Sequence, residues 1–151
     1  MKFRTLVASK YLIAEAFTKE LVENFSTSLE KKYELKALEL TLALSSSKDP
    51  QLKLHAIVIP KEKRGMGIGS KVMEEIVDFA DKYNKIIVLT PSKDFGATSV
   101  PRLQRFYSGF GFLRNTGKSK DFGFSEAMIR YPLGKTRSKY LDDYSKENKN
   151  G

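Results

Sequence analysis

Three glycines, Gly65, Gly67 and Gly69, stand at alternate positions in a segment whose residue types could bind an anion. The apolar run Ile57–Ile59 before them predicts a strand, and the apolar periodicity after Ser70 predicts a helix. Glycine lacks a Cβ, so the backbone between these elements can approach a ligand closely. The first N–H groups of a helix lack intrahelical partners and lie at the positive end of its dipole. The segment is therefore predicted to bind phosphate.

Two common nucleotide-binding loops do not fit this spacing. A Walker loop requires G-x-x-x-x-G-K-[ST], whereas the order here is Gly69-Ser70-Lys71, and Arg64 stands where the first glycine is needed. A dinucleotide-binding loop requires G-x-G-x-x-G, and Ser70 stands where its third glycine is needed. ATP, GTP and dinucleotides are thus disfavoured.

The segment from Arg64 to Gly69 resembles the Q/R-x-x-G-x-G/A motif of the GNAT superfamily of N-acetyltransferases. The segment from Glu62 to Gly67 has the same glycine spacing, but this alternative frame would place a carboxylate against phosphates. The resemblance implies that the loop surrounds the pyrophosphate of acetyl-coenzyme A (acetyl-CoA), the expected co-substrate. The implied loop residues are Arg64, Gly65, Met66, Gly67, Ile68, Gly69 and Ser70.

A second resemblance to this family lies at Tyr107, four residues before the pair Gly111-Phe112. In the family this tyrosine is a general acid, because a thiolate expelled into a partly dry site needs a proton or a strong donor. The alternative is that Tyr107 only packs its helix against the sheet. At Val100 the family often has asparagine, so polar contacts to the pantetheine arm must come from elsewhere.

Further cofactor contacts follow from the resemblance. The backbone groups of Ile57, Val58 and Ile59, at a strand end where family members carry a β-bulge, would pair with the amides of the pantetheine arm. Arg102 or Arg105 would meet the 3′-phosphate, or else these arginines are ordinary solvated side chains.

The acceptor amine must lose a proton before it attacks a thioester, so a base is needed. His55 is the only histidine and lies on the strand beside the expected cofactor, which makes it the candidate base, with a structural role as the alternative. Glu126 is a second candidate. Because the chain has no cysteine, a cysteine nucleophile is excluded, and a single histidine excludes a His-rich zinc site. No metal is expected.

The pattern of apolar residues predicts the elements that position these groups. Alternating leucines predict strands at Leu38–Leu44 and Leu52–Val58, and the apolar run Lys85–Thr90 predicts a buried strand. A right-handed crossover would make this last strand parallel to the one before the glycine loop. Short strands are predicted at Phe112–Asn115 and Phe124–Tyr131. We therefore expect a GNAT-like α/β fold with a mixed, mostly antiparallel sheet and helices on both faces.

The two ends of the chain are less regular. Phe3–Val7 is predicted as a strand and Ser9 as the cap of an amphipathic helix that reaches Leu29, which would leave the N-terminal half abbreviated for the family. Residues 1–133 are expected to form the GNAT-like domain. Residues 134–151 are expected to form a polar, flexible tail with at most a single helical turn.

Composition limits the function classes. Hydrophobic residues make up 40% and charged residues 30%, as in folded domains. No apolar run approaches the roughly 20 residues of a membrane span, so we expect a cytoplasmic protein without a membrane partner. The net charge is +9, of which the segment from Gly134 carries +2 and the rest +7. A basic surface favours acidic or nucleic-acid-associated partners and weakly disfavours polycationic acceptors.

The resemblance thus implies an N-acetyltransferase that transfers acetyl from acetyl-CoA directly to a primary amine, with a protein or nucleic-acid-associated acceptor slightly favoured. One alternative, prompted by Val100 and the unclear base, is a non-catalytic acyl-CoA-binding protein. Another is a basic nucleic-acid-binding domain, prompted by aromatic residues such as Phe122 among lysines and arginines, although no recognition motif is present. The sequence leaves the oligomeric state open.

Overall fold

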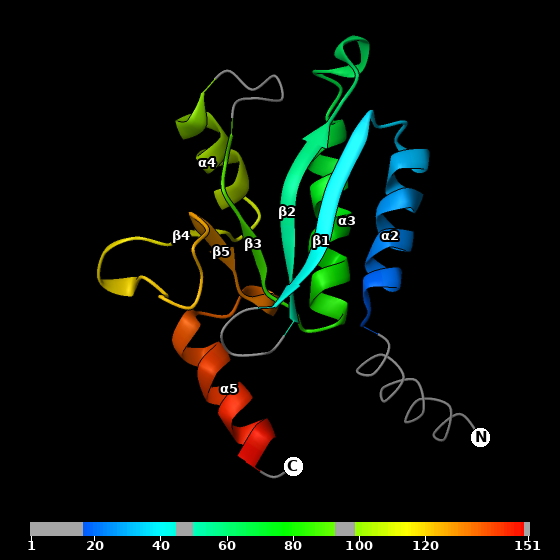
Figure 1. The fold of residues 1–151 in the computed structure, drawn as a ribbon. Coiled ribbons are helices and arrows are strands. Elements are labelled where there is room, and N and C mark those ends of the chain that lie inside the picture. Colours follow the sequence, from blue (N-terminus) through cyan, green and yellow to red (C-terminus); the bar gives the residue numbers. More distant parts are fainter. Residues whose placement is uncertain (1–16, 45–49, 93–98, 150–151) are drawn as a thin grey trace, which may run out of the picture.

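The computed structural model describes residues 17–44, 50–92 and 99–149. The predicted strand at Phe3–Val7 and the predicted cap at Ser9 lie outside these residues. No helix in the described ranges is long and apolar enough to cross a membrane. The elements, in chain order, are α2 (Lys19–Lys32), β1 (Ala37–Leu44), β2 (Pro50–Val58), α3 (Ile68–Lys82), β3 (Ile87–Leu89), α4 (Val100–Ser108), β4 (Leu113–Arg114), β5 (Met128–Arg130) and α5 (Arg137–Lys149) (Figure 1).

Five strands form one mixed sheet in the order β1-β2-β3-β5-β4. β2 and β3 run parallel, and every other neighbouring pair runs antiparallel. The parallel pair arises because α3 connects the two strands as a crossover helix. The predicted mixed, mostly antiparallel sheet is thereby confirmed.

Helices cover both faces of this sheet, as predicted. Alternate residues of a strand point to opposite faces, and in β3 Ile87 and Leu89 join the larger apolar core whereas Val88 joins a second core. The larger core includes the buried sides of α2 and α3. The second core includes Tyr140 of α5, whose ring centroid lies 5.5 Å from that of Tyr131.

α2 is capped at its start by Thr18 and packs against α3. The Thr18 hydroxyl accepts a hydrogen bond from the Leu21 backbone N–H at 3.2 Å, which satisfies one of the free donors of the first turn. The Phe25 ring stacks on Phe79 of α3 at a centroid distance of 4.0 Å. α2 therefore lies against α3 on one side and alongside β1 on the other (Figure 1).

β4 and β5 are shorter than the predicted strands. The Asn115 side chain accounts for this difference, because its Nδ2 donates to the carbonyl oxygens of Asp121, Phe124 and Glu126 at 3.1 to 3.2 Å. These backbone groups are thus satisfied by a side chain rather than by a strand ladder.

Residues 137–149 form α5, which is longer than the single turn predicted. Tyr140 is buried, and Asp143 pairs with Lys135 at 2.9 Å and with Lys139 at 3.2 Å. The polar sequence concealed the helix because one aromatic residue supplies most of its packing. The division into a domain at 1–133 and a tail at 134–151 stays a prediction.

Candidate active site

The sheet opens between β2 and β3. These two strands are paired only as far as Leu54 and Leu89, whereas β2 stays paired with β1 as far as Val58. β2 therefore has an edge, from His55 to Val58, that no described strand covers. The register between β1 and β2 also shifts at His55, which forms a β-bulge.

The glycine loop exposes its backbone at the end of this opening. Gly65 and Gly67 have φ angles of +83° and +76°, and a Cβ built on either would meet no atom within 4 Å. Gly67 begins α3 without a capping side chain, and the first turn carries no acidic residue. A Cβ on Gly69 would lie 3.6 Å from Ile59 and 3.7 Å from Phe106, so this glycine lets α3 start close to α4. In the predicted loop, Arg64, Gly65, Met66, Gly67 and Ser70 are exposed, and Ile68 and Gly69 are half-buried.

The three predicted contacts for the pantetheine arm lie at or just beyond the end of β2. Ile57 lines the cleft at the opening, whereas Val58 and Ile59 do not. The Ile59 carbonyl oxygen accepts a hydrogen bond from Arg64 Nε at 3.2 Å. The Arg64 guanidinium therefore lies beside the end of β2, next to the uncovered edge.

The cleft at the opening has a volume of about 70 Å³. One wall comes from β2 with His55 and Ile57, and the other comes from Thr90 after β3 and from Leu103 and Tyr107 of α4. The fold thus brings Tyr107 to the same cleft as His55, although 52 positions separate them in the sequence.

Tyr107 combines a packed ring with an available hydroxyl. Its ring makes edge contacts with Phe106 and Phe112 at centroid distances of 5.3 and 5.7 Å. Its hydroxyl has no hydrogen-bond partner among the described residues. Burial raises the pKa of Tyr107 above its ordinary value of 10.0, so the phenol stays protonated at neutral pH. Such a group can donate a proton or a hydrogen bond into the cleft.

The sequence matches the model of the Acetyltransferase (GNAT) family over residues 29–112, which include the glycine loop, the opening and Tyr107. The chain belongs to the GNAT family.

Two solved structures resemble this GNAT chain. Arabidopsis thaliana Naa50, in complex with the bisubstrate analogue CoA-Ac-MVNAL, is 20% identical over 62% of this chain and 60% of that chain, with a TM-score of 0.41. Tetrahymena GCN5 is 10% identical over 78% of this chain and 89% of that chain, with a TM-score of 0.39. The match thus spans less than two thirds of the Naa50 chain. No curated protein matches the chain.

His55 of this GNAT chain is exposed at the β2 bulge. Its Nε2 lies 3.0 Å from the Thr41 hydroxyl, and this contact fixes the ring over β1. His55 also lines the cleft. Its role as the base stays a prediction.

Glu126, the second candidate base, is already engaged. Its carboxylate lies 3.1 Å from Lys53 Nζ and accepts a hydrogen bond from the Ser125 hydroxyl at 3.3 Å. Burial alone would raise the pKa of Glu126, but the hydrogen bond and charge of Lys53 more than offset this and lower the pKa. A carboxylate with a lowered pKa is a weaker base, which counts against Glu126 in this role.

A network that the sequence does not predict joins α3 to the turn after α4. Arg130 is buried in β5 and donates to both carboxylate oxygens of Asp81 at 2.7 and 3.0 Å, and its Nε donates to the Phe110 carbonyl at 2.8 Å. Asp81 also accepts from the Leu133 backbone N–H at 2.7 Å. An arginine inside an apolar strand was the available signal, but it does not reveal the partner. The network ties the helix that begins at the glycine loop to the turn that follows Tyr107.

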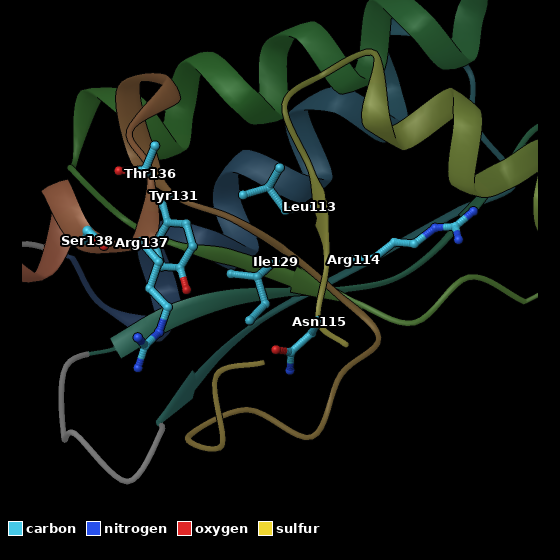
Figure 2. Close-up of a pocket in the computed structure, with 8 residues that line it drawn as sticks. All are labelled: Leu113, Arg114, Asn115, Ile129, Tyr131, Thr136, Arg137 and Ser138. Atoms are coloured by element: carbon cyan, nitrogen blue, oxygen red, sulfur yellow. The ribbon is translucent and has the colours of Figure 1, made fainter. Parts of the chain in front are cut away.

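A hollow of about 280 Å³ lies elsewhere, between β4, β5 and the start of α5 (Figure 2). Arg114 and Arg137 line it, but Figure 2 shows their side chains extending in different directions, and Arg137 Nε contacts Asp121 at 3.2 Å. The two cations do not converge on a common ligand. Across the described ranges, no group of three or more histidine and acidic residues could hold a metal ion.

Proposed function

We propose that this protein transfers the acetyl group of acetyl-CoA directly to a primary amine. The observation that supports this most strongly is the sheet opening, which has the exposed glycine loop at one end and Tyr107 on its wall. Membership of the GNAT family supports acetyl-CoA as the donor. Because the sequence contains no cysteine, direct attack of the amine on the thioester is favoured over an acyl-cysteine intermediate.

The loop and the strand edge have the properties that this co-substrate needs. The exposed backbone from Arg64 to Ser70 would surround the pyrophosphate at the start of α3. The uncovered edge of β2 from His55 to Ile57 would offer backbone groups to the pantetheine amides, as a pairing strand would, whereas the Val58 carbonyl oxygen already accepts from the Lys36 N–H at 2.8 Å. Arg102 or Arg105 of α4 would meet the 3′-phosphate.

Two side chains would move the protons. His55, directly or through a water, would accept a proton from the amine, and the freed nitrogen would bond to the carbonyl carbon. The amine enters protonated, so after the attack its nitrogen still carries one surplus proton, which passes to solvent. The C–S bond then breaks, and Tyr107 donates its proton to the departing sulfur. The products are an N-acetylated acceptor and the CoA thiol, and solvent returns the proton from His55 to Tyr107.

The acceptor is proposed to be a primary amine of a protein or of a nucleic-acid-associated molecule. The +7 charge outside the segment from Gly134 supports an encounter with such a macromolecule, because a strongly charged surface attracts large charged partners.

The proposal is tested by the melting-temperature shift with acetyl-CoA and by release of free thiol across a panel of primary amines. A shift together with amine-dependent release is expected. A shift without release for any amine would instead indicate a non-catalytic acyl-CoA-binding protein. Absence of a shift, with salt-sensitive retention on a DNA column, would indicate a nucleic-acid-binding domain.

A further inference from the structure

A groove of about 420 Å³ lies between α2 and the outer edge of β1. β1 is the first strand in the sheet order, so no described strand pairs with this edge. α2 contributes Glu23, Ser26 and Glu30 to the groove, and β1 contributes Glu39. An extended chain could therefore lie along this strand edge, which no described strand covers.

The groove is negatively charged on a chain whose net charge is positive. Glu30 and Glu39 have no ion-pair partner among the described residues, and Glu23 makes only an exposed contact of 3.9 Å with Lys19. No lysine or arginine of the described ranges lines the groove. Salt screens the rest of the protein's charge beyond about 8 Å at physiological ionic strength, so the nearby carboxylates dominate the field in the groove.

Ser26 supplies an independent sign of a ligand. Ser26 lines the groove and is 6% exposed, and its buried hydroxyl has no hydrogen-bond partner. A buried hydroxyl without a partner destabilises a folded protein, so such groups are uncommon unless a ligand satisfies them.

The groove meets the cleft at His55. This residue lines both hollows, and its Nε2 contacts Thr41, which also lines the groove. A chain that lies in the groove could therefore bring an amine past His55 to the wall that carries Tyr107.

We propose that this groove binds a positively charged segment of the acceptor and directs its primary amine to the cleft. The inference rests on the proposed acetyl transfer and names its substrate class, a peptide segment with basic residues around the reactive amine. Net charge alone favours an acidic acceptor, and the local carboxylates reverse that preference.

The test uses the full chain saturated with CoA and two fluorescently labelled peptides, each with one lysine as its free primary amine. The residues around that lysine are arginines in one peptide and glutamates in the other. Fluorescence anisotropy measures binding to wild type, to the groove variant Glu30→Gln/Glu39→Gln and to the control variant Glu20→Gln/Glu74→Gln. The control removes the same charge at exposed carboxylates outside the groove.

We expect wild type to prefer the arginine peptide, and we expect the groove variant to lose about tenfold in affinity while the control loses less than about twofold. Ser26→Ala should weaken peptide binding without lowering the melting temperature, because it removes an unsatisfied hydroxyl from the free protein. A structural role for Ser26 would not give this combination. Equal affinity for both peptides, an equal loss in the control, or no binding to wild type would overturn the proposal.

Thiol release from acetyl-CoA, measured with the same peptides, separates the two proposals. Selective peptide binding without thiol release would contradict acetyl transfer and leave the groove assignment intact. Thiol release without preference for the arginine peptide would contradict the groove assignment and leave acetyl transfer intact.

Discussion

The two regions that meet at the sheet opening carry opposite charge. Around the glycine loop, Lys61, Arg64 and Lys71 are exposed, and they form no ion pair with any described residue. Along the α2–β1 groove, Glu30 and Glu39 are the unpaired groups. The basic glycine loop attracts an anionic co-substrate, and the acidic groove attracts a cationic acceptor. The two ligands can therefore approach the same cleft from different sides. The net charge of the chain reveals neither region.

Tyr107 lies where the two regions meet. Its substitution should therefore impair acetyl transfer while acetyl-CoA and the acceptor still bind. Tyr107→Phe should keep acetyl-CoA affinity and lower kcat by about 10² to 10³-fold, because the phenyl ring retains its packing but cannot protonate the leaving thiolate. Stopped-time thiol release at saturating acetyl-CoA measures the loss. The matched control is Tyr83→Phe, at a half-buried tyrosine that packs on Phe79 of α3 away from the cleft. Unchanged turnover in Tyr107→Phe would mean that Tyr107 only packs.

The buried pair Arg130–Asp81 tests whether the glycine loop and Tyr107 are held in place together. Arg130→Met should lower the free energy of unfolding by about 3 kcal/mol, because Asp81 keeps a partly buried charge without its partner. Urea titration measures this loss. Arg130→Lys should recover only part of it, since lysine cannot reproduce the paired contacts to Asp81 together with the contact to Phe110. Full stability in Arg130→Met would show that the network is dispensable.

The glycine loop can be impaired without disturbing the acidic groove. Gly67→Glu should weaken acetyl-CoA binding by roughly 30-fold, or about 2 kcal/mol, because a side chain and a negative charge enter the space proposed for phosphate. The control is Gly117→Glu, since Gly117 also has a positive φ of 69° with nothing within 4 Å of its Cβ position. Both variants carry similar backbone strain at a positive φ. A difference between them in acetyl-CoA affinity, measured by calorimetry, therefore isolates the contribution of the glycine loop to binding. Equal affinity in the two variants would place the phosphates elsewhere.

The glycine loop could be predicted from the sequence and the α2–β1 groove could not, for a physical reason. A strand, a glycine turn and a helix are consecutive, so local spacing predicts Gly65 to Ser70 and the start of α3. The groove joins Glu30 of α2 to Glu39 of β1 across a surface that depends on how the helix packs on the strand. No periodicity in the sequence indicates how close Glu30 and Glu39 lie in the folded protein. Arg130 and Asp81 are separated by 49 positions and were missed for the same reason.

Acid should weaken the interactions of Asp81 and of Glu126 to different extents, and this effect is the smallest of the four. Burial alone would raise the pKa of Asp81, but the hydrogen bonds from Arg130 and Leu133 more than offset it and lower the pKa below 3.8. The folded protein therefore binds a proton at Asp81 less readily than the unfolded chain does. The resulting stability is present above about pH 4 and is lost as the pH falls through the folded pKa.

The pKa of Glu126 is lowered in the same direction, because the interaction with Lys53 more than offsets the effect of burial, so its contribution to stability is lost over the acidic range as well. Melting temperatures between pH 7 and pH 3 should fall less steeply in Asp81→Asn and in Glu126→Gln than in wild type, although both variants start lower at pH 7. The flatter of the two curves identifies the carboxylate that contributes more to acid unfolding. Because Asp81 has three hydrogen bonds to buried or backbone donors, we expect it to be Asp81. A slope in Asp81→Asn equal to that of wild type would show that the Asp81–Arg130 interaction does not limit stability in acid.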